Sequence, residues 1–109
     1  MATSYKVLGQ SAPSATTNTD VYTVPSARES VISTIVIANR AATAGTFRLA
    51  VRPNGASIAD QHYLAYDVPI AANDSTTLTL GITVDATDVI TFYASSANMS
   101  VNVFGSEIS

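Results

Sequence analysis

Short runs of β-branched and aromatic residues recur along this chain from about residue 20 to the C-terminus, and polar, Gly or Pro breaks separate them. The clearest runs cover residues 31–37, 46–51 and 89–93. Such residue types fit a pleated, half-buried surface, whereas in a helix they lose side-chain rotamer freedom. No segment shows helical periodicity beyond a single turn. The pattern therefore predicts an all-β fold.

The spacing of the runs indicates how the strands are arranged. Expected strands cover residues 21–24, 30–38, 46–52, 62–66, 75–80, 89–93 and 99–104, with a further short candidate at 5–8. Residues 30–38 are apolar nearly throughout, which is typical of a central strand. Pro53-Asn54-Gly55 is a strong turn signal because Asn-Gly tolerates positive φ, and residues 57–60 form either one helical turn or a loop. Leu78 and Leu80 alternate with threonines, as on a strand with one wet face.

Seven or eight strands with turns at this spacing predict a single antiparallel β-sandwich of jelly-roll or Ig-like type. The chain has 109 residues, which corresponds to one domain with enough buried surface for one core. Residues 9–19 are small and polar, a composition typical of a flexible arm or linker. We therefore divide the chain into an extended N-terminal arm at 1–19 and a β-sandwich domain at 20–109. A frayed terminus and an arm that orders only on a neighbouring subunit both fit this composition.

Charged residues make up only 12% of the chain, and Lys6 is its sole lysine. A surface with so little charge is poorly protected against association, which favours a protein with neighbours. The net charge is −3 and the arginines are scattered. Nucleic-acid binding needs clustered Lys and Arg, so a nucleic-acid partner is not expected. The N-terminus lacks the pattern of a signal peptide and no apolar run approaches a membrane span, so we expect a soluble protein made in a cytoplasm.

Residues capable of catalysis or metal binding are few. His62 is the only histidine and cysteine is absent, which excludes His-based triads, multi-His sites and thiolate sites. Asp85 and Asp88 stand three apart, but this spacing matches no EF-hand loop and Asp is also an ordinary turn residue. Whether this pair holds a cation stays open at this point. We expect no catalytic residues, no cofactor and no enzymatic activity.

Exposed aromatic rings would be the mark of a sugar-binding module. Trp is absent, and Tyr22, Tyr63, Tyr66 and Tyr93 are dispersed among the expected strands. In a sandwich such residues more often pack in the core or at an edge with the hydroxyl reaching water.

The chain resembles a family of small virion structural proteins of tailed bacteriophages, of the kind met in phages of cyanobacteria and marine bacteria. The matching segments are YKVLGQ at 5–10, AP at 12–13, VYTVP at 21–25, STIVIAN at 33–39, FRLAVRP at 47–53 with Gly55, HYLAYD at 62–67, PIAAND at 69–74, LTLGI at 78–82, TDVI at 87–90 and FGSEI at 104–108. These motifs are structural punctuation and contain no catalytic chemistry.

The resemblance implies a virion structural protein, made in the host cytoplasm and located in the virion. Within that class it implies a capsid decoration (cement) protein that binds the major capsid protein and stabilises the assembled shell. The protein would form a homo-oligomer, with a trimer favoured. We expect the 1–19 arm to dock on the capsid or a sister subunit through Tyr5, Val7, Leu8 and Pro13.

Two other functions remain open. A tail, baseplate or fibre-associated adaptor that binds tail proteins would use the same sandwich but be present in few copies per virion. A host-recognition or carbohydrate-binding module would show glycan affinity and an exposed aromatic patch.

Overall fold

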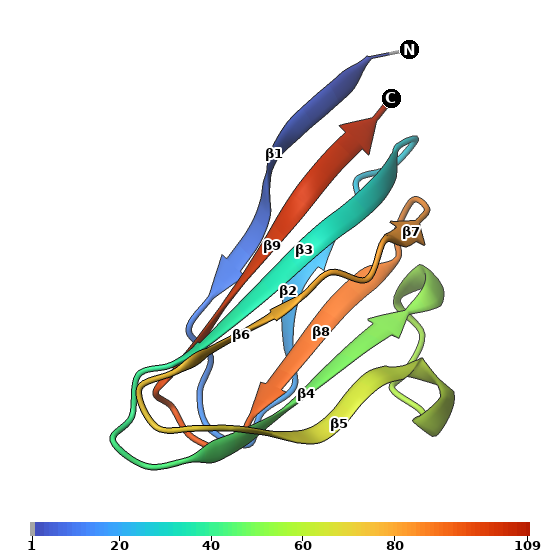
Figure 1. Cartoon of the computed structure of the whole chain (residues 1–109). Coiled ribbons are helices and arrows are strands. Elements are labelled where there is room, and N and C mark those ends of the chain that lie inside the picture. The colour runs from blue at the N-terminus through green and yellow to red at the C-terminus, as the bar shows by residue number, and fades with distance from the viewer. Residues whose placement is uncertain (1) are drawn as a thin grey trace.

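The computed structural model describes residues 2–109 and shows two antiparallel sheets packed face to face, which confirms the all-β sandwich (Figure 1). The elements within these residues are β1 (Thr3–Ser11), β2 (Thr19–Thr23), β3 (Glu29–Asn39), β4 (Gly45–Arg52), β5 (Tyr63–Ile70), β6 (Ser75–Leu78), β7 (Ile82–Val84), β8 (Val89–Ala94) and β9 (Met99–Ile108), with short 3₁₀ turns η1 (Pro53–Gly55) and η2 (Asp60–His62). Each expected run contributes to a strand, and β7 is an additional one. No helix within residues 2–109 is long and apolar enough to cross a membrane.

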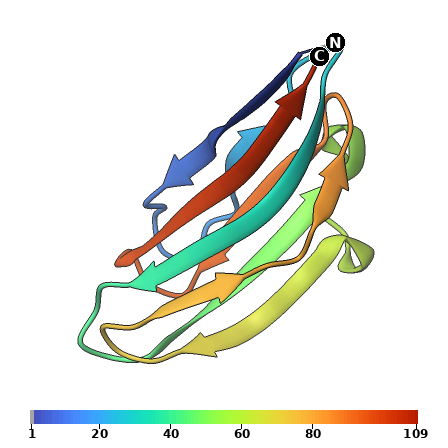
Figure 2. The same ribbon diagram turned by 45° about the horizontal axis from the view of Figure 1, so that its top comes forward.

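One sheet has the order β1-β9-β3-β6, and the other has the order β2-β8-β4-β5. Strand β7 pairs with the first half of β3, on the same edge on which β6 pairs with its second half. Strand β3 pairs with β9 along one side and with β6 and β7 along the other, so its central position is confirmed. The first and last strands are neighbours, and both chain ends lie at the same end of the sandwich (Figure 2).

The core lies between the sheets and consists of residues that alternate along each strand. A bulge between Ile32 and Thr34 lets Ile32 and Ile35, three residues apart, face the same interior. The rings of Phe47 and Phe92 stack at its centre with their centroids 5.9 Å apart. The largest fully buried apolar side chains of the core are those of Val24, Ile32, Ile35, Ile37, Phe47, Leu49, Ile90, Phe92, Met99, Val101 and Val103.

Most of residues 1–19 belongs to the sandwich in the structure. Strand β1 runs antiparallel to β9, and Gly9 passes so close to β2 that a Cβ there would lie 2.3 Å from the carbonyl oxygen of Val21. Residues 12–18 then connect the sheets, where the N–H of Thr16 donates to the carbonyl of Ala94 (2.8 Å). The segment is therefore held by β9 along β1, by the close approach of Gly9 to β2, and by the bond from Thr16 to the end of β8.

The turn at 53–55 is confirmed, with φ of 54° at Asn54 and 67° at Gly55. Two local predictions are wrong. His62 lies in η2 ahead of β5, because its Nδ1 accepts the N–H of Ala59 (3.0 Å) and closes the turn. The strand expected to run through Leu80 ends at Leu78, because Gly81 takes a positive φ of 63° and leaves Leu80 exposed.

Candidate protein-contact surface

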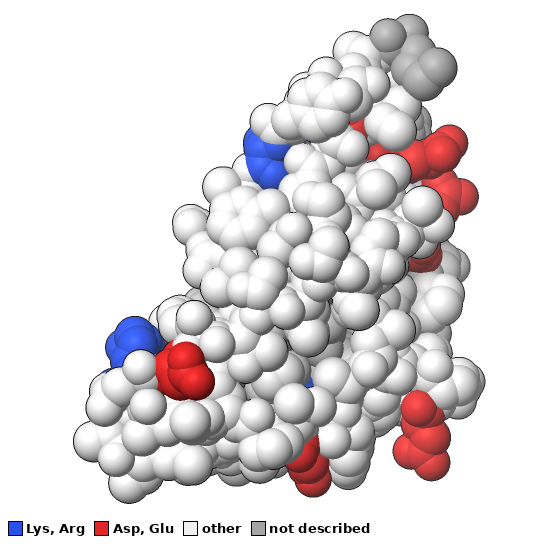
Figure 3. All heavy atoms as spheres, in the orientation of Figure 1, with Lys and Arg blue, Asp and Glu red and all other residues white. Residues whose placement is uncertain are grey.

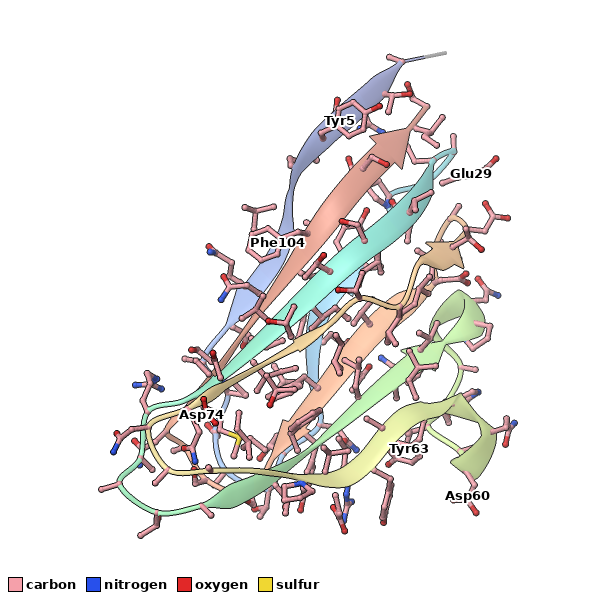
Figure 4. The ribbon with its side chains drawn as sticks, in the orientation of Figure 1. Tyr5, Glu29, Asp60, Tyr63, Asp74 and Phe104 are labelled. Atoms are coloured by element: carbon pink, nitrogen blue, oxygen red, sulfur yellow. The ribbon has the colours of Figure 1, made fainter. Side chains whose placement is uncertain are left out.

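The outer face of the β1-β9-β3 sheet presents apolar side chains to solvent. Strand register places Tyr5, Ser106 and Val31 in one row across this face, and Val7, Phe104 and Thr34 in the next. Tyr5 is 85% exposed and Val7 46%. Figure 4 shows Tyr5 and Phe104 projecting from the outside of the sheet, away from the core.

A shallow depression of about 490 Å³ lies between these rows. It is lined by Tyr5, Lys6, Val31, Ser33, Phe104, Gly105 and Ser106. The space-filling view shows a broad uncharged area over β1, β9 and β3, with charged side chains near its ends (Figure 3). Glu29 and Asp74 stand at opposite ends of this face (Figure 4). We call this area the neutral face.

The four residues expected to make contacts lie in different surroundings. Tyr5 and Val7 are exposed on the neutral face. A bulge between Val7 and Gly9 turns Leu8 inward, where it packs against the core, and Pro13 is buried in the connection between the sheets. Only Tyr5 and Val7 of the four therefore present their side chains at the surface.

A buried carboxylate lies behind β1, on the inner side of the same sheet. Glu107 is 5% exposed and accepts hydrogen bonds from the ammonium of Lys6 (2.8 Å), the hydroxyl of Tyr22 (2.7 Å) and the guanidinium of Arg28 (3.2 Å). Since the Tyr22 hydroxyl donates to Glu107, it accepts from the hydroxyl of Ser30 (2.6 Å). These contacts join β1, β2, β3 and β9 at one end of the sandwich.

The electrostatics of this cluster indicate a structural role. Lys6, followed by the Tyr22 hydroxyl, lowers the pKa of Glu107 below its usual value, against the opposing effect of burial. Burial raises the pKa of Tyr22 to about 12, and the neighbouring Glu107 adds to this shift. A general acid needs a raised carboxyl pKa, and a general base needs a free lone pair facing a substrate. Glu107 is instead an ionised carboxylate already engaged by three donors.

The outer face of the other sheet holds a cluster of tyrosines around Arg48. The guanidinium lies 4.2 Å from the ring centroid of Tyr66 and 4.3 Å from that of Tyr93, and it bonds the carboxylate of Asp67 (2.7 Å). Tyr63 meets Tyr66 edge to face, with centroids 4.9 Å apart. We call these five residues the Tyr–Arg cluster.

A bulge in β5 assembles the Tyr–Arg cluster. Asp67 has a φ of 50°, and the register between β4 and β5 shifts here, so the consecutive residues Tyr66 and Asp67 both reach Arg48. Sequence reasoning treated the tyrosines as dispersed and did not find this cluster. Nothing in a local pattern marks the bulge, because Asp at positive φ is also an ordinary loop residue.

The loop aspartates accept hydrogen bonds from backbone N–H groups of their own turn and, for Asp88, also of the neighbouring turn η1. The two carboxylate oxygens of Asp88 accept the backbone N–H groups of Asn54 and Asp85, each at 2.8 Å. Asp74 accepts the N–H of Ser75 in the same manner. Among the residues that the structure describes, no three or more His, Cys, Asp or Glu side chains are grouped so as to hold a metal ion.

Comparison with protein-family models, with curated proteins and with solved structures finds no match to this chain.

Proposed function

We propose that this chain is a non-enzymatic virion structural protein that decorates an assembled capsid shell, with its neutral face against the major capsid protein. The observation that supports this most is the exposed Tyr5 beside Phe104 on a sheet face with little charge. Tyr is enriched and charged residues are depleted at the centres of protein–protein contacts. The phage-virion part of the proposal rests on the sequence resemblance.

The dimensions of the molecule fit such a role. It measures 45 × 27 × 20 Å, so its broad sides are sheet faces. A standard interface needs about 800 Å² from each partner, which a face of this size can supply. Burying uncharged side chains also avoids the desolvation cost of unpaired ions.

The mechanism of stabilisation is mass action. A protein that binds the assembled lattice and not the free subunits shifts the equilibrium towards the shell. Repetition over many lattice positions multiplies the effect, and a homo-oligomer adds avidity. No catalytic group is needed for any of these steps.

The first test is the number of copies per purified virion, measured by quantitative mass spectrometry against the major capsid protein. Hundreds of copies support decoration. A handful of copies would move the protein to the tail or baseplate, and its absence would overturn the virion proposal.

A second test uses binding to capsids that lack this protein, measured by co-sedimentation. Tyr5→Glu places a charge on the neutral face and should abolish binding. Tyr66→Glu is the matched control, because Tyr66 is 56% exposed on the opposite sheet. Equal binding by both variants would contradict the use of the neutral face.

The Tyr–Arg cluster favours a second candidate, a host-recognition module that binds carbohydrate. Tyrosine hydroxyls, a guanidinium and a carboxylate are held together there by ring and ion contacts. Such a module predicts glycan binding that Tyr66→Ala weakens and Tyr5→Ala leaves unchanged. A glycan array with these two variants separates the candidates.

A further inference from the structure

Strand β1 is a long edge strand with an open side. From Thr3 to Val7 its register with β9 is continuous, and β9 lies on one side only. Other edges in the described residues are less suitable for pairing. Strands β6 and β7 have four and three residues, β2 has five with a register shift between Asp20 and Tyr22, and β5 has Pro69 and register shifts. Short strands, prolines and bulges are the usual devices that block an edge. In β1 the bulge comes only at Leu8, so the segment before it stays open.

The backbone groups that face the open side follow from the ladder. Ala2 and Ser109 exchange both of their hydrogen bonds, N to O at 3.3 and 2.9 Å. Antiparallel ladders alternate, so the register then assigns Ser4 and Lys6 to the side of β9. Thr3, Tyr5 and Val7 consequently direct their N–H and C=O groups away from β9, towards the free edge.

We propose that this free edge pairs antiparallel with β1 of a second copy of the chain, with Tyr5 opposite Tyr5. In this register Thr3 of each copy faces Val7 of the other, so all three residues with free backbone groups find partners. The result is a two-fold, isologous interface in which two sheets become one. It gives a dimer, in place of the trimer that the resemblance implied.

The occupant is a second copy because the strand is complementary to itself. Its free backbone groups are symmetric about Tyr5, and the side chains of Thr3, Tyr5 and Val7 suit cross-strand pairs. The one charged residue of the segment, Lys6, would face Ser4 and not the other Lys6. Its ammonium is also neutralised within its own copy by Glu107, at 2.8 Å. No like-charge contact opposes the pairing.

Pairing also extends the neutral face, because Tyr5 and Val7 of both copies lie on its outer side. The inference rests on β1 alone and not on the proposed function, so it is tested on purified protein without capsids.

The first experiment measures the mass of the full chain in solution by light scattering after size exclusion, over a range of concentrations. We expect a concentration-dependent dimer. Tyr5→Pro removes an N–H that faces the free edge and that β9 does not use, so it should fold and be monomeric. Tyr5→Thr keeps the N–H and should retain the dimer. A monomeric or trimeric wild type, or a dimeric Tyr5→Pro protein with a native circular dichroism spectrum, would overturn the proposal.

A second experiment reads the register and does not require the proline variant to fold. The chain has no cysteine, so Tyr5→Cys introduces a single thiol into each copy. A short bifunctional thiol reagent should link the Tyr5→Cys dimer, because directly opposite residues have Cα atoms about 5.5 Å apart. Val7→Cys is the control, since its thiols would be offset by four residues, about 13 Å. Equal linking of the two variants, or linking of Val7→Cys alone, would contradict this register.

Discussion

The ammonium of Lys6 in β1 lies 2.8 Å from the carboxylate of Glu107 in β9, and this ion pair joins the first strand of the chain to the last. The two side chains lie on the inner side of the sheet, where the hydroxyl of Tyr22 also reaches Glu107. A buried charge is stable only with such partners. The cluster therefore holds the first strand, whose outer side bears Tyr5, against the sandwich.

Glu107→Gln should lower the free energy of unfolding by about 2 kcal/mol at pH 7, because a neutral amide replaces the carboxylate that accepts three hydrogen bonds. Lys6 and Arg28 are 47% and 43% exposed, so water can solvate them in the variant. Urea unfolding measures the loss. Glu29→Gln is the control, since Glu29 is an exposed carboxyl of the neighbouring strand β3.

The same cluster predicts an acid dependence. In the folded protein the pKa of Glu107 lies below the usual 4.5. The stability that the ionised carboxylate contributes is therefore fully present above pH 4.5 and is lost as the pH falls through the lowered pKa. The stability of the wild type should therefore converge on that of Glu107→Gln below pH 4.5. Parallel stability curves for the two proteins on acidification would contradict this assignment.

Tyr22 predicts an alkaline dependence of opposite sign. The pKa of Tyr22 rises from 10.0 to about 12 in the folded protein. The stability that the protonated hydroxyl contributes is therefore fully present below pH 10 and is lost as the pH rises towards 12. Absorbance at the tyrosinate band should contain a late-ionising component from Tyr22. Tyr22→Phe should remove this late component; its persistence in the variant would show that another tyrosine is responsible.

Gly9→Ala should destabilise the protein by about 1–3 kcal/mol, the usual cost of overpacking. A Cβ at Gly9 would lie 2.3 Å from the backbone carbonyl oxygen of Val21, which cannot move without displacing β2. Gly45→Ala is the matched control, because its Cβ would first meet the flexible end of Met99. Chemical denaturation should show a smaller loss in the free energy of unfolding for Gly45→Ala than for Gly9→Ala. Equal losses would mean that the β1–β2 approach imposes no particular constraint.

Asp88→Ala should lower stability by about 1–2 kcal/mol, because it leaves the N–H groups of Asn54 and Asp85 without their acceptor. Calcium should leave the melting temperature of the wild type unchanged, since both carboxylate oxygens of Asp88 already accept backbone N–H groups, from Asn54 and from Asp85. A calcium-dependent rise in melting temperature that Asp88→Ala abolishes would instead reveal a cation site.

Local pattern was sufficient to predict most strands. Ile35 and Ile37 of β3 face the core while Val36 is only half-buried, as alternation along a strand requires. The turn at Asn54 and Gly55 also followed from local chemistry, because both residues adopt positive φ. Of the four residues expected to make contacts, Tyr5 and Val7 are exposed, whereas the burial of Leu8 and Pro13 depends on a bulge and a connection that no local pattern marks.

The sequence by itself determined that this chain forms strands and where most of them lie, since residue type and a period of two act within a few residues. Its composition also determined that the chain has little charge. Tertiary structure alone decided which strands pair. It brought Glu107 to Tyr22, 85 residues away, and placed Tyr66 and Tyr93 on either side of Arg48. It also left one side of β1 open. Strand pairing and bulges depend on contacts between distant segments, and these contacts are selected by the packing of the whole core.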